Sequence, residues 1–272
     1  MNQGPTQDVI ALLRGFATSK ISVLAALAVF PVSYLINWLI STFYLYAVLD
    51  VAALPHGALI KLAALYYALR ICITAATLPL AMLVYSAAQL KASSRLRAIV
   101  GKHARIYQLS LLASLLVLAG VLLAVALSFN KLYELLVSKF IEAELWAKSP
   151  IARIYLLWTR TGWIDEYVES QLIYIDLLIL VSLLAFTVAS AYYIKVLDEI
   201  RTRTGAGALK YTVLALMAFL MTTALHITLS MLGAYSWIVE VAVVLTLVFY
   251  AYSLYTGLED AEAHLTKLLI AQ

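Results

Sequence analysis

The stretch Lys91–Arg105, KASSRLRAIVGKHAR, carries five Lys or Arg residues and no acidic residue, and it separates two long apolar runs. In membrane proteins, short loops rich in Lys and Arg remain on the cytoplasmic side. This basic midsection therefore predicts a membrane-spanning helix on each side of a cytoplasmic loop. The remaining segments can be assigned to one side of the membrane by counting outward from it.

The composition predicts the class of protein. Of the 272 residues, 64% are hydrophobic and 12% are charged, and the mean hydropathy is +0.95. A soluble domain is about half apolar and about a quarter charged. We therefore expect an all-α integral membrane protein that forms a single polytopic domain over residues 1–272. The 18 Tyr beside few Asn and one Cys are typical of a thermophilic, archaeal source.

Six apolar runs are long enough to cross a bilayer, which takes about 20 residues. They cover residues 21–49, 62–90, 107–129, 172–196, 211–232 and 237–258. This topology places most of the Lys and Arg residues, and both termini, on the cytoplasmic side of the plasma membrane. A seventh span at 151–163 would expose the second basic loop, 195–210, to the outside, so six spans are preferred.

Four further segments have apolar residues on one helical face and polar residues on the other. We expect them to be amphipathic helices in or near the membrane interface. They cover residues 8–16, 132–146, 151–163 and 258–270.

An internal similarity relates two of the predicted hairpins. Shifting the chain by 104 residues without gaps superposes the hairpin of spans two and three on that of spans four and five. The matched residues are Ser86, Ala87, Lys91, Arg97, Gly101, Ala104, Tyr107, Leu112 and Leu116 with Ser190, Ala191, Lys195, Arg201, Gly205, Ala208, Tyr211, Leu216 and Leu220. Either this is a parallel repeat, as some transporters have, or two hairpins of similar composition match by chance.

Four ionisable residues fall within the predicted spans, all on the outer side of the bilayer centre: Arg70, Asp176, His226 and Glu240. A lone charge at mid-bilayer costs at least about 2.5–3.5 kcal/mol, so pairing or hydration is expected. One interpretation is an outward-facing polar vestibule that binds a solute or carries protons. The alternative is that Asp176 and Glu240 reach interfacial water and that Arg70 forms a structural ion pair.

The two basic loops are candidate surfaces for a cytoplasmic protein or for anionic lipid headgroups. Their candidate residues are Lys91, Arg95, Arg97, Lys102, Arg105, Arg201 and Arg203. The first loop has no aromatic residue before Tyr107, so it has little with which to stack single-stranded nucleic acid. Lipid is therefore favoured over nucleic acid as a direct partner.

Motifs of catalysis are missing from the sequence. It contains no Walker-type nucleotide loop, no His-Glu-x-x-His and no Gly-x-Ser-x-Gly, and its four His residues have no metal-ligand spacing. We therefore predict no enzyme activity, no cofactor and no metal site, with a lipid-modifying enzyme of sparse motifs as a remote alternative.

Two functions fit this sequence better than the others. The first is a transport protein, a permease or channel-forming subunit that uses the outer polar residues. The second is a non-catalytic membrane subunit of a larger secretion, DNA-transfer or pilus-type machine, with a separate ATPase docked on the basic loops. The expected partners are membrane lipid and either other proteins or further copies of the chain, and nucleic acid only through such a machine.

Overall fold

The computed structural model describes residues 5–50, 56–146, 181, 184, 186–232 and 237–270, which are helical apart from the short turns and contain no strand. Five helices in this part of the chain are long and apolar enough to cross a membrane. They cover Val9–Tyr44, Ile60–Arg97, Val100–Ile141, Leu209–His226 and Val241–Lys267. The prediction of an all-α, multi-pass membrane protein is confirmed at this level. Residues 172–180, 182, 183 and 185 of the predicted span 172–196 and the whole amphipathic segment 151–163 lie outside the described residues.

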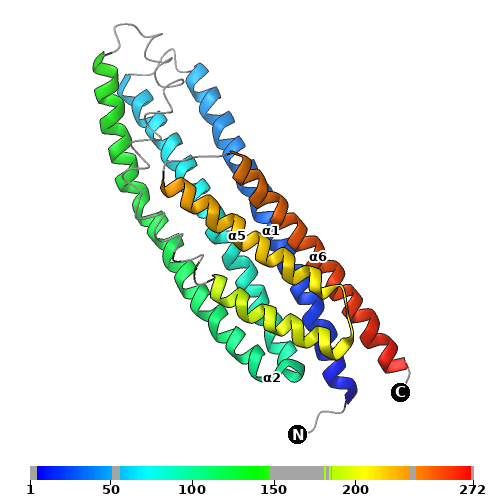
Figure 1. The fold of residues 1–272 in the computed structure, drawn as a ribbon. Helices are drawn as coiled ribbons and strands as arrows, with labels where there is room; N and C mark the ends of the chain where they lie inside the picture. The colour runs from blue at the N-terminus through cyan, green and yellow to red at the C-terminus, as the bar shows by residue number, and fades with distance from the viewer. Residues whose placement is uncertain are drawn as a thin grey trace. The chain divides into compact units, whose positions relative to one another are not determined.

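The helices at the two ends of the chain are longer than the predicted spans. Helix α1 (Pro5–Asp50) includes the segment 8–16, and helix α6 (Trp237–Ile270) includes the segment 258–270 (Figure 1). The structure therefore continues these amphipathic segments into the neighbouring spans, where we had expected separate interfacial helices. No Pro or Gly stands between residues 16 and 21 to end the first helix there.

Helix α2 (His56–Trp146) is a run of two helices that meet at Gly101, with backbone angles φ 51° and ψ −115°. The chain reverses its direction there, as Figure 1 shows. A positive φ is accessible to Gly because it lacks a Cβ atom. The basic midsection is thus helical on both sides of one glycine, where we had expected a loop. The predicted amphipathic segment 132–146 is likewise continuous with the third span.

The chain divides into two compact units. Unit 1 comprises Met1–Leu27, Ala81–Ala119 and Ile179–Gln272, and unit 2 comprises Ala28–Leu80 and Gly120–Leu178. The described helices pass from one unit to the other at three points. These points lie close to Pro31, Pro79 and Gly120. Proline kinks a helix because it removes one backbone hydrogen bond and clashes with the preceding turn. Each crossing therefore coincides with a residue that weakens helical continuity.

The two units bury different side chains. The described core of unit 2 consists of aromatic and aliphatic residues, among them Tyr44, Tyr67 and Phe140. Apart from tyrosines, the buried polar side chains of the described residues all lie in unit 1. They are Ser19, Ser22, Ser86, Gln89, Ser93, Ser114, Ser190, Thr204, Thr212, Thr223 and Ser253.

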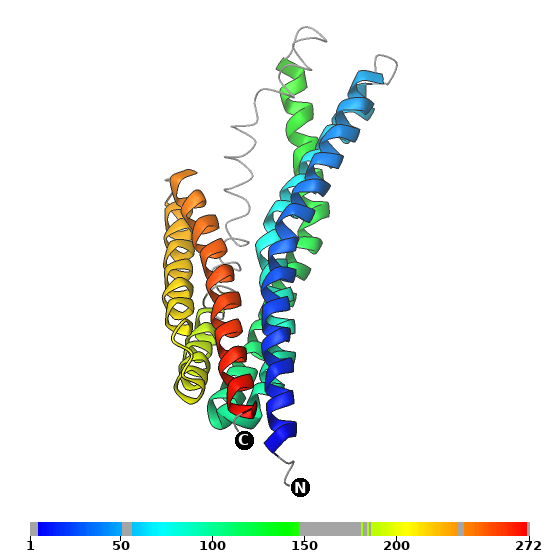
Figure 2. The same cartoon turned by 90° about the vertical axis from the view of Figure 1, so that its right-hand side faces the viewer.

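Helices α5 (Leu209–Met231) and α6 lie side by side in unit 1 (Figures 1 and 2). Gly257 permits their close approach, because a Cβ atom there would lie 2.8 Å from the Thr212 hydroxyl oxygen. The Thr212 hydroxyl donates a hydrogen bond to the Ser253 carbonyl oxygen at 2.7 Å. A single glycine in a helix costs only about 1 kcal/mol relative to alanine. This cost is too small to end helix α6, which continues through Gly257.

Candidate functional site

Arg70 is exposed on helix α2 in unit 2. Its guanidinium donates to the hydroxyl of Tyr66, one turn earlier, at 3.3 Å. The Tyr66 ring stacks on Tyr44 with 4.3 Å between ring centroids, and its hydroxyl lies 3.1 Å from the Ser41 hydroxyl. The described partner of Arg70 is therefore a neutral tyrosine on its own helix.

The other three candidates for an outer polar vestibule are only partly described. His226 is half-buried on helix α5, and Glu240 lies on helix α6, but its side chain is outside the described residues. Asp176 also lies outside them. The predicted pairing of Arg70 with Asp176 or Glu240 stays a prediction.

A pocket of about 450 Å³ lies in unit 2, between the two halves of helix α2. Lys61 contributes from the first half, and the second half contributes Tyr133, Glu134, Val137, Ser138 and Ile141. Its two charged lining residues have opposite signs. None of the four vestibule candidates lines it.

Unit 1 contains two helical hairpins with corresponding patterns of exposure. We call residues 82–119 hairpin 1 and residues 186–224 hairpin 2. From 85 to 96, each residue is buried, half-buried or exposed in the same way as the residue 104 positions later. Gly101 and Gly205 also correspond, and they are the two residues with positive φ in the described part of the chain.

Beyond the turns the correspondence shifts from 104 to 105 positions. Buried residues 104, 107, 111, 114 and 118 then match buried residues 209, 212, 216, 219 and 223. The ungapped pairing of Tyr107 with Tyr211 is wrong, because Tyr107 is 1% exposed and Tyr211 is 62% exposed. The reason is one additional residue in the 205–208 turn, since in hairpin 1 the helix resumes directly after Gly101.

Basic residues at the end of hairpin 1 have two distinct environments. Arg95 is half-buried and donates to the Arg14 carbonyl oxygen at 3.1 Å and to the Thr18 hydroxyl at 2.7 Å, which ties helix α2 to helix α1. The other four cations are exposed, and within the described residues none of them forms an ion pair. They are Lys91, Arg97, Lys102 and Arg105.

In hairpin 2, both candidate arginines are paired within their own helix. Arg201 contacts the Asp198 carboxylate at 2.7 Å, and Arg203 contacts the Glu199 carboxylate at 2.9 Å. Of the seven predicted docking residues, the structure therefore leaves only the four of hairpin 1 without an intramolecular partner in the part of the chain that it describes.

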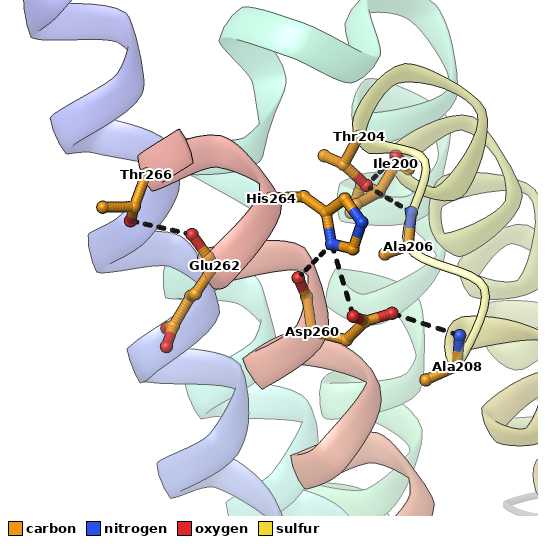
Figure 3. A network of polar contacts seen from close by, with 8 residues as sticks. All are labelled: Ile200, Thr204, Ala206, Ala208, Asp260, Glu262, His264 and Thr266. Atoms are coloured by element: carbon orange, nitrogen blue, oxygen red, sulfur yellow. Dashed lines mark hydrogen bonds and ion pairs between the residues drawn. The ribbon is translucent and has the colours of Figure 1, made fainter. Parts of the chain in front are cut away.

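The turn of hairpin 2 is also held by helix α6 (Figure 3). The Asp260 carboxylate accepts from the backbone N–H of Ala208 at 3.3 Å, directly before helix α5, where a negative charge is favourable. His264 lies 3.3 Å from the other carboxylate oxygen of Asp260. Thr204 accepts from the backbone N–H of Ala206 at 3.3 Å. These contacts fix the turn against the C-terminal helix.

Sequence reasoning missed a buried polar layer next to these hairpin ends. The Gln89 amide donates to the Ser22 hydroxyl at 2.9 Å, and the Ser19 hydroxyl lies 3.3 Å from its amide oxygen. The hydroxyls of Tyr85 and Tyr250 are 2.6 Å apart. The signal in the sequence was a glutamine inside an apolar run, two residues before Lys91. These bonds hold helices α1, α2 and α6 in a defined register.

Within the described residues, no group of three or more His, Cys, Asp or Glu side chains could hold a metal ion. No protein-family model matches the chain, and neither does any curated protein or solved structure.

Proposed function

We propose that this protein is a non-catalytic membrane subunit of a larger machine, and that a cytoplasmic partner docks on the end of hairpin 1. The observation that carries the proposal is a set of three exposed cations near the turn, Arg97, Lys102 and Arg105, which form no intramolecular ion pair within the described residues. A separate ATPase of a secretion, DNA-transfer or pilus-type apparatus is the class of partner that fits. The chain itself has no nucleotide-binding loop of the Walker type.

The spacing of charges along helix α2 supports this placement. Arg70 and Lys91 are both exposed, and residues 71–90 between them carry no charge. At 1.5 Å per residue this run measures about 30 Å, the thickness of the hydrocarbon core. We therefore place Arg70 at the outer boundary of the core and Lys91 at its inner boundary.

Gly101 then lies about 15 Å beyond Lys91 along the helix. The headgroup region adds only about 5–8 Å on each side of the hydrocarbon core. The turn of hairpin 1 would thus extend past the headgroups into the cytoplasm. Six spans, with the fourth supplied by residues 172–196, would put both termini and both glycine turns on that side. On this topology, hairpins 1 and 2 are the two copies of a parallel repeat.

Transport is the less favoured function. It requires Arg70 to share a cavity with Asp176, His226 or Glu240, whereas the described hydrogen bond of Arg70 is to Tyr66 on its own helix. The pairing of Arg70 with Tyr66 and its place at the outer boundary also give it a role without transport. Docking, by contrast, needs only the exposed turn and its charges.

Cross-linking in native membranes tests the proposal. A photoreactive amino acid replaces Ala98, near the turn, and cross-linked partners are identified by mass spectrometry. We expect a cytoplasmic protein whose cross-link is lost when Arg97, Lys102 and Arg105 are all changed to Gln. The matched control changes Lys61, Arg70 and Lys131 to Gln, which removes the same charge at the predicted outer side. Cross-links that survive loss of the basic turn would contradict the proposal, as would loss in both sets.

A further inference from the structure

Corresponding positions of the two hairpins carry different charges. Asp198 in hairpin 2 corresponds to Ser94 in hairpin 1, and Arg201 corresponds to Arg97. Asp198 pairs with Arg201 at 2.7 Å, whereas the Ser94 hydroxyl donates to the Lys91 carbonyl oxygen at 2.8 Å. Both Ser94 and Asp198 are exposed, so this difference lies on the surface and does not affect the core.

The second acid of hairpin 2 is also replaced. Glu199, which pairs with Arg203, corresponds to Arg95. Arg95 points its guanidinium to helix α1, where it bonds Arg14 and Thr18. Hairpin 1 therefore has no acid of its own over residues 91–105, while hairpin 2 has one acid for each of its two paired arginines.

An intrahelical carboxylate removes an arginine from intermolecular recognition in two ways. It occupies the guanidinium donors that would otherwise form a charge-assisted, bidentate pair with a partner. It also offsets the positive charge that a partner would meet within the Debye length, which is about 8 Å at physiological salt. The same backbone can thus present an open anion site in one hairpin and a closed one in the other.

We propose that Ser94 and Asp198 determine which of the two corresponding hairpins receives the partner, and that the site recognises carboxylates on the surface of a cytoplasmic protein. Hairpin 1 is open because Ser94 leaves Arg97 unpaired, and hairpin 2 is closed by Asp198 and Glu199. This inference rests on the proposed docking function and adds the residues that select the site.

Carboxylates of a protein fit this site better than lipid or nucleic acid. Along the helix, Arg97 lies about 9 Å and the turn at Gly101 about 15 Å past Lys91, and both distances exceed the thickness of the headgroup layer, about 5–8 Å. Tyr107, the aromatic residue nearest to the turn in hairpin 1, is 1% exposed and cannot stack a base. Arginine and lysine at the rim of an interface attract an acidic surface and increase the rate of association.

The experiment uses the full-length protein in nanodiscs of phosphatidylcholine, with a fluorescent polyglutamate peptide as the probe and anisotropy as the readout. Ser94→Asp should weaken binding about three- to tenfold, as expected when one cation is neutralised by an adjacent carboxylate. Its control, Thr266→Asp, adds the same charge to an exposed site on another helix, where it is not one turn from Arg97, and should weaken binding less than Ser94→Asp does.

A gain of binding separates selection from damage to the fold. The double variant Asp198→Ser/Glu199→Gln frees Arg201 and Arg203, and it should add a second peptide site to each protein. Its control, Glu134→Gln/Glu259→Gln, removes the same negative charge at two exposed positions that have no ion pair within the described residues, and it should leave one site. A single site in the first variant would overturn the inference.

Two further measurements test which class of molecule binds at hairpin 1. Adding phosphatidylglycerol to the nanodiscs should leave peptide affinity within about twofold at fixed salt; complete displacement would assign the site to lipid headgroups. An oligothymidylate that binds more tightly than polyglutamate would assign it to nucleic acid. Either result would overturn the choice of protein carboxylates.

The charge-removal variant distinguishes this inference from the docking function itself. If Arg97→Gln/Lys102→Gln/Arg105→Gln abolishes binding while Ser94→Asp has no effect, docking stands and selection by Ser94 fails. If neither variant weakens binding, both proposals fail.

Discussion

Hairpins 1 and 2 have the same pattern of burial, yet they differ in where their polar groups are bonded. Hairpin 1 directs Gln89 and Arg95 to helix α1 and leaves its outermost cations unpaired in the described structure. Hairpin 2 pairs its arginines internally and fastens its turn to helix α6 through Asp260. Two hairpins with the same pattern of burial can therefore differ in whether their cations are left unpaired or are bonded within the described structure.

The turn glycines should show the largest effects on stability. Gly101→Ala should lower the free energy of unfolding by about 2–3 kcal/mol, because φ 51° with ψ −115° lies in a region essentially restricted to glycine. Gly205→Ala should cost about 1–2 kcal/mol, because its φ of 78° is unfavourable for a residue with a Cβ atom. The cost should be no larger, since that Cβ atom would meet no atom closer than 3.9 Å.

Chemical unfolding in detergent micelles, followed by circular dichroism, measures both changes. Gly120→Ala is the matched control, because this helical glycine has open space around it and a negative φ. It should be neutral or stabilising by about 0.5–1 kcal/mol. Equal losses at all three glycines would refute the correspondence of the two turns.

The next largest difference in stability is expected between buried polar groups at corresponding positions of the two hairpins. Gln89→Leu removes the bonds to Ser19 and Ser22 and should cost about 1–2 kcal/mol, within the range measured for hydrogen bonds between membrane helices. Tyr193 is its counterpart in hairpin 2. Ser19 and Gln89 are polar neighbours of the Tyr193 hydroxyl, but no described group meets it in hydrogen-bond geometry.

Tyr193→Phe should therefore be neutral or slightly stabilising, because it removes a buried hydroxyl without a bond. The same unfolding assay compares the two variants. A Tyr193→Phe loss as large as that of Gln89→Leu would show that hairpin 2 depends on a polar tie of its own.

The smallest effects on stability are expected at the surface. Arg95→Gln loses two bonds to helix α1 and should cost about 1 kcal/mol. Glu199→Gln, at the corresponding position, breaks a partly exposed i,i+4 pair and should cost only about 0.3–0.5 kcal/mol. The salt dependence separates the two variants. In 1 M NaCl the loss of stability in Glu199→Gln should disappear, while most of the loss in Arg95→Gln should remain.

The class of fold follows from the sequence because apolar run length and charge bias act through local transfer free energies. The hairpin correspondence was also found there, up to the glycine turns. The extra residue of the 205–208 turn escaped detection because an ungapped comparison cannot place it, and only burial reveals the shift.

Other features depend on contacts between residues distant in the sequence. Gln89 and Ser19 are 70 positions apart, and nothing local to either one identifies the other. The basic run predicts a docking role for Arg95, but its side chain bonds to residues 14 and 18. Lys91–Arg105 resembles a loop by charge, while its residues other than glycine are compatible with helix.

Exchanging the charges of the two hairpins tests the central claim most directly. In native membranes, the double variant Ser94→Asp/Asp198→Ser is combined with a photoreactive residue at Ala98 or at its counterpart Thr202. The wild-type chain should cross-link its cytoplasmic partner from position 98, and the exchanged chain should show a weaker cross-link there and a new one at position 202. A cross-link that stays at position 98 with unchanged yield would contradict the account.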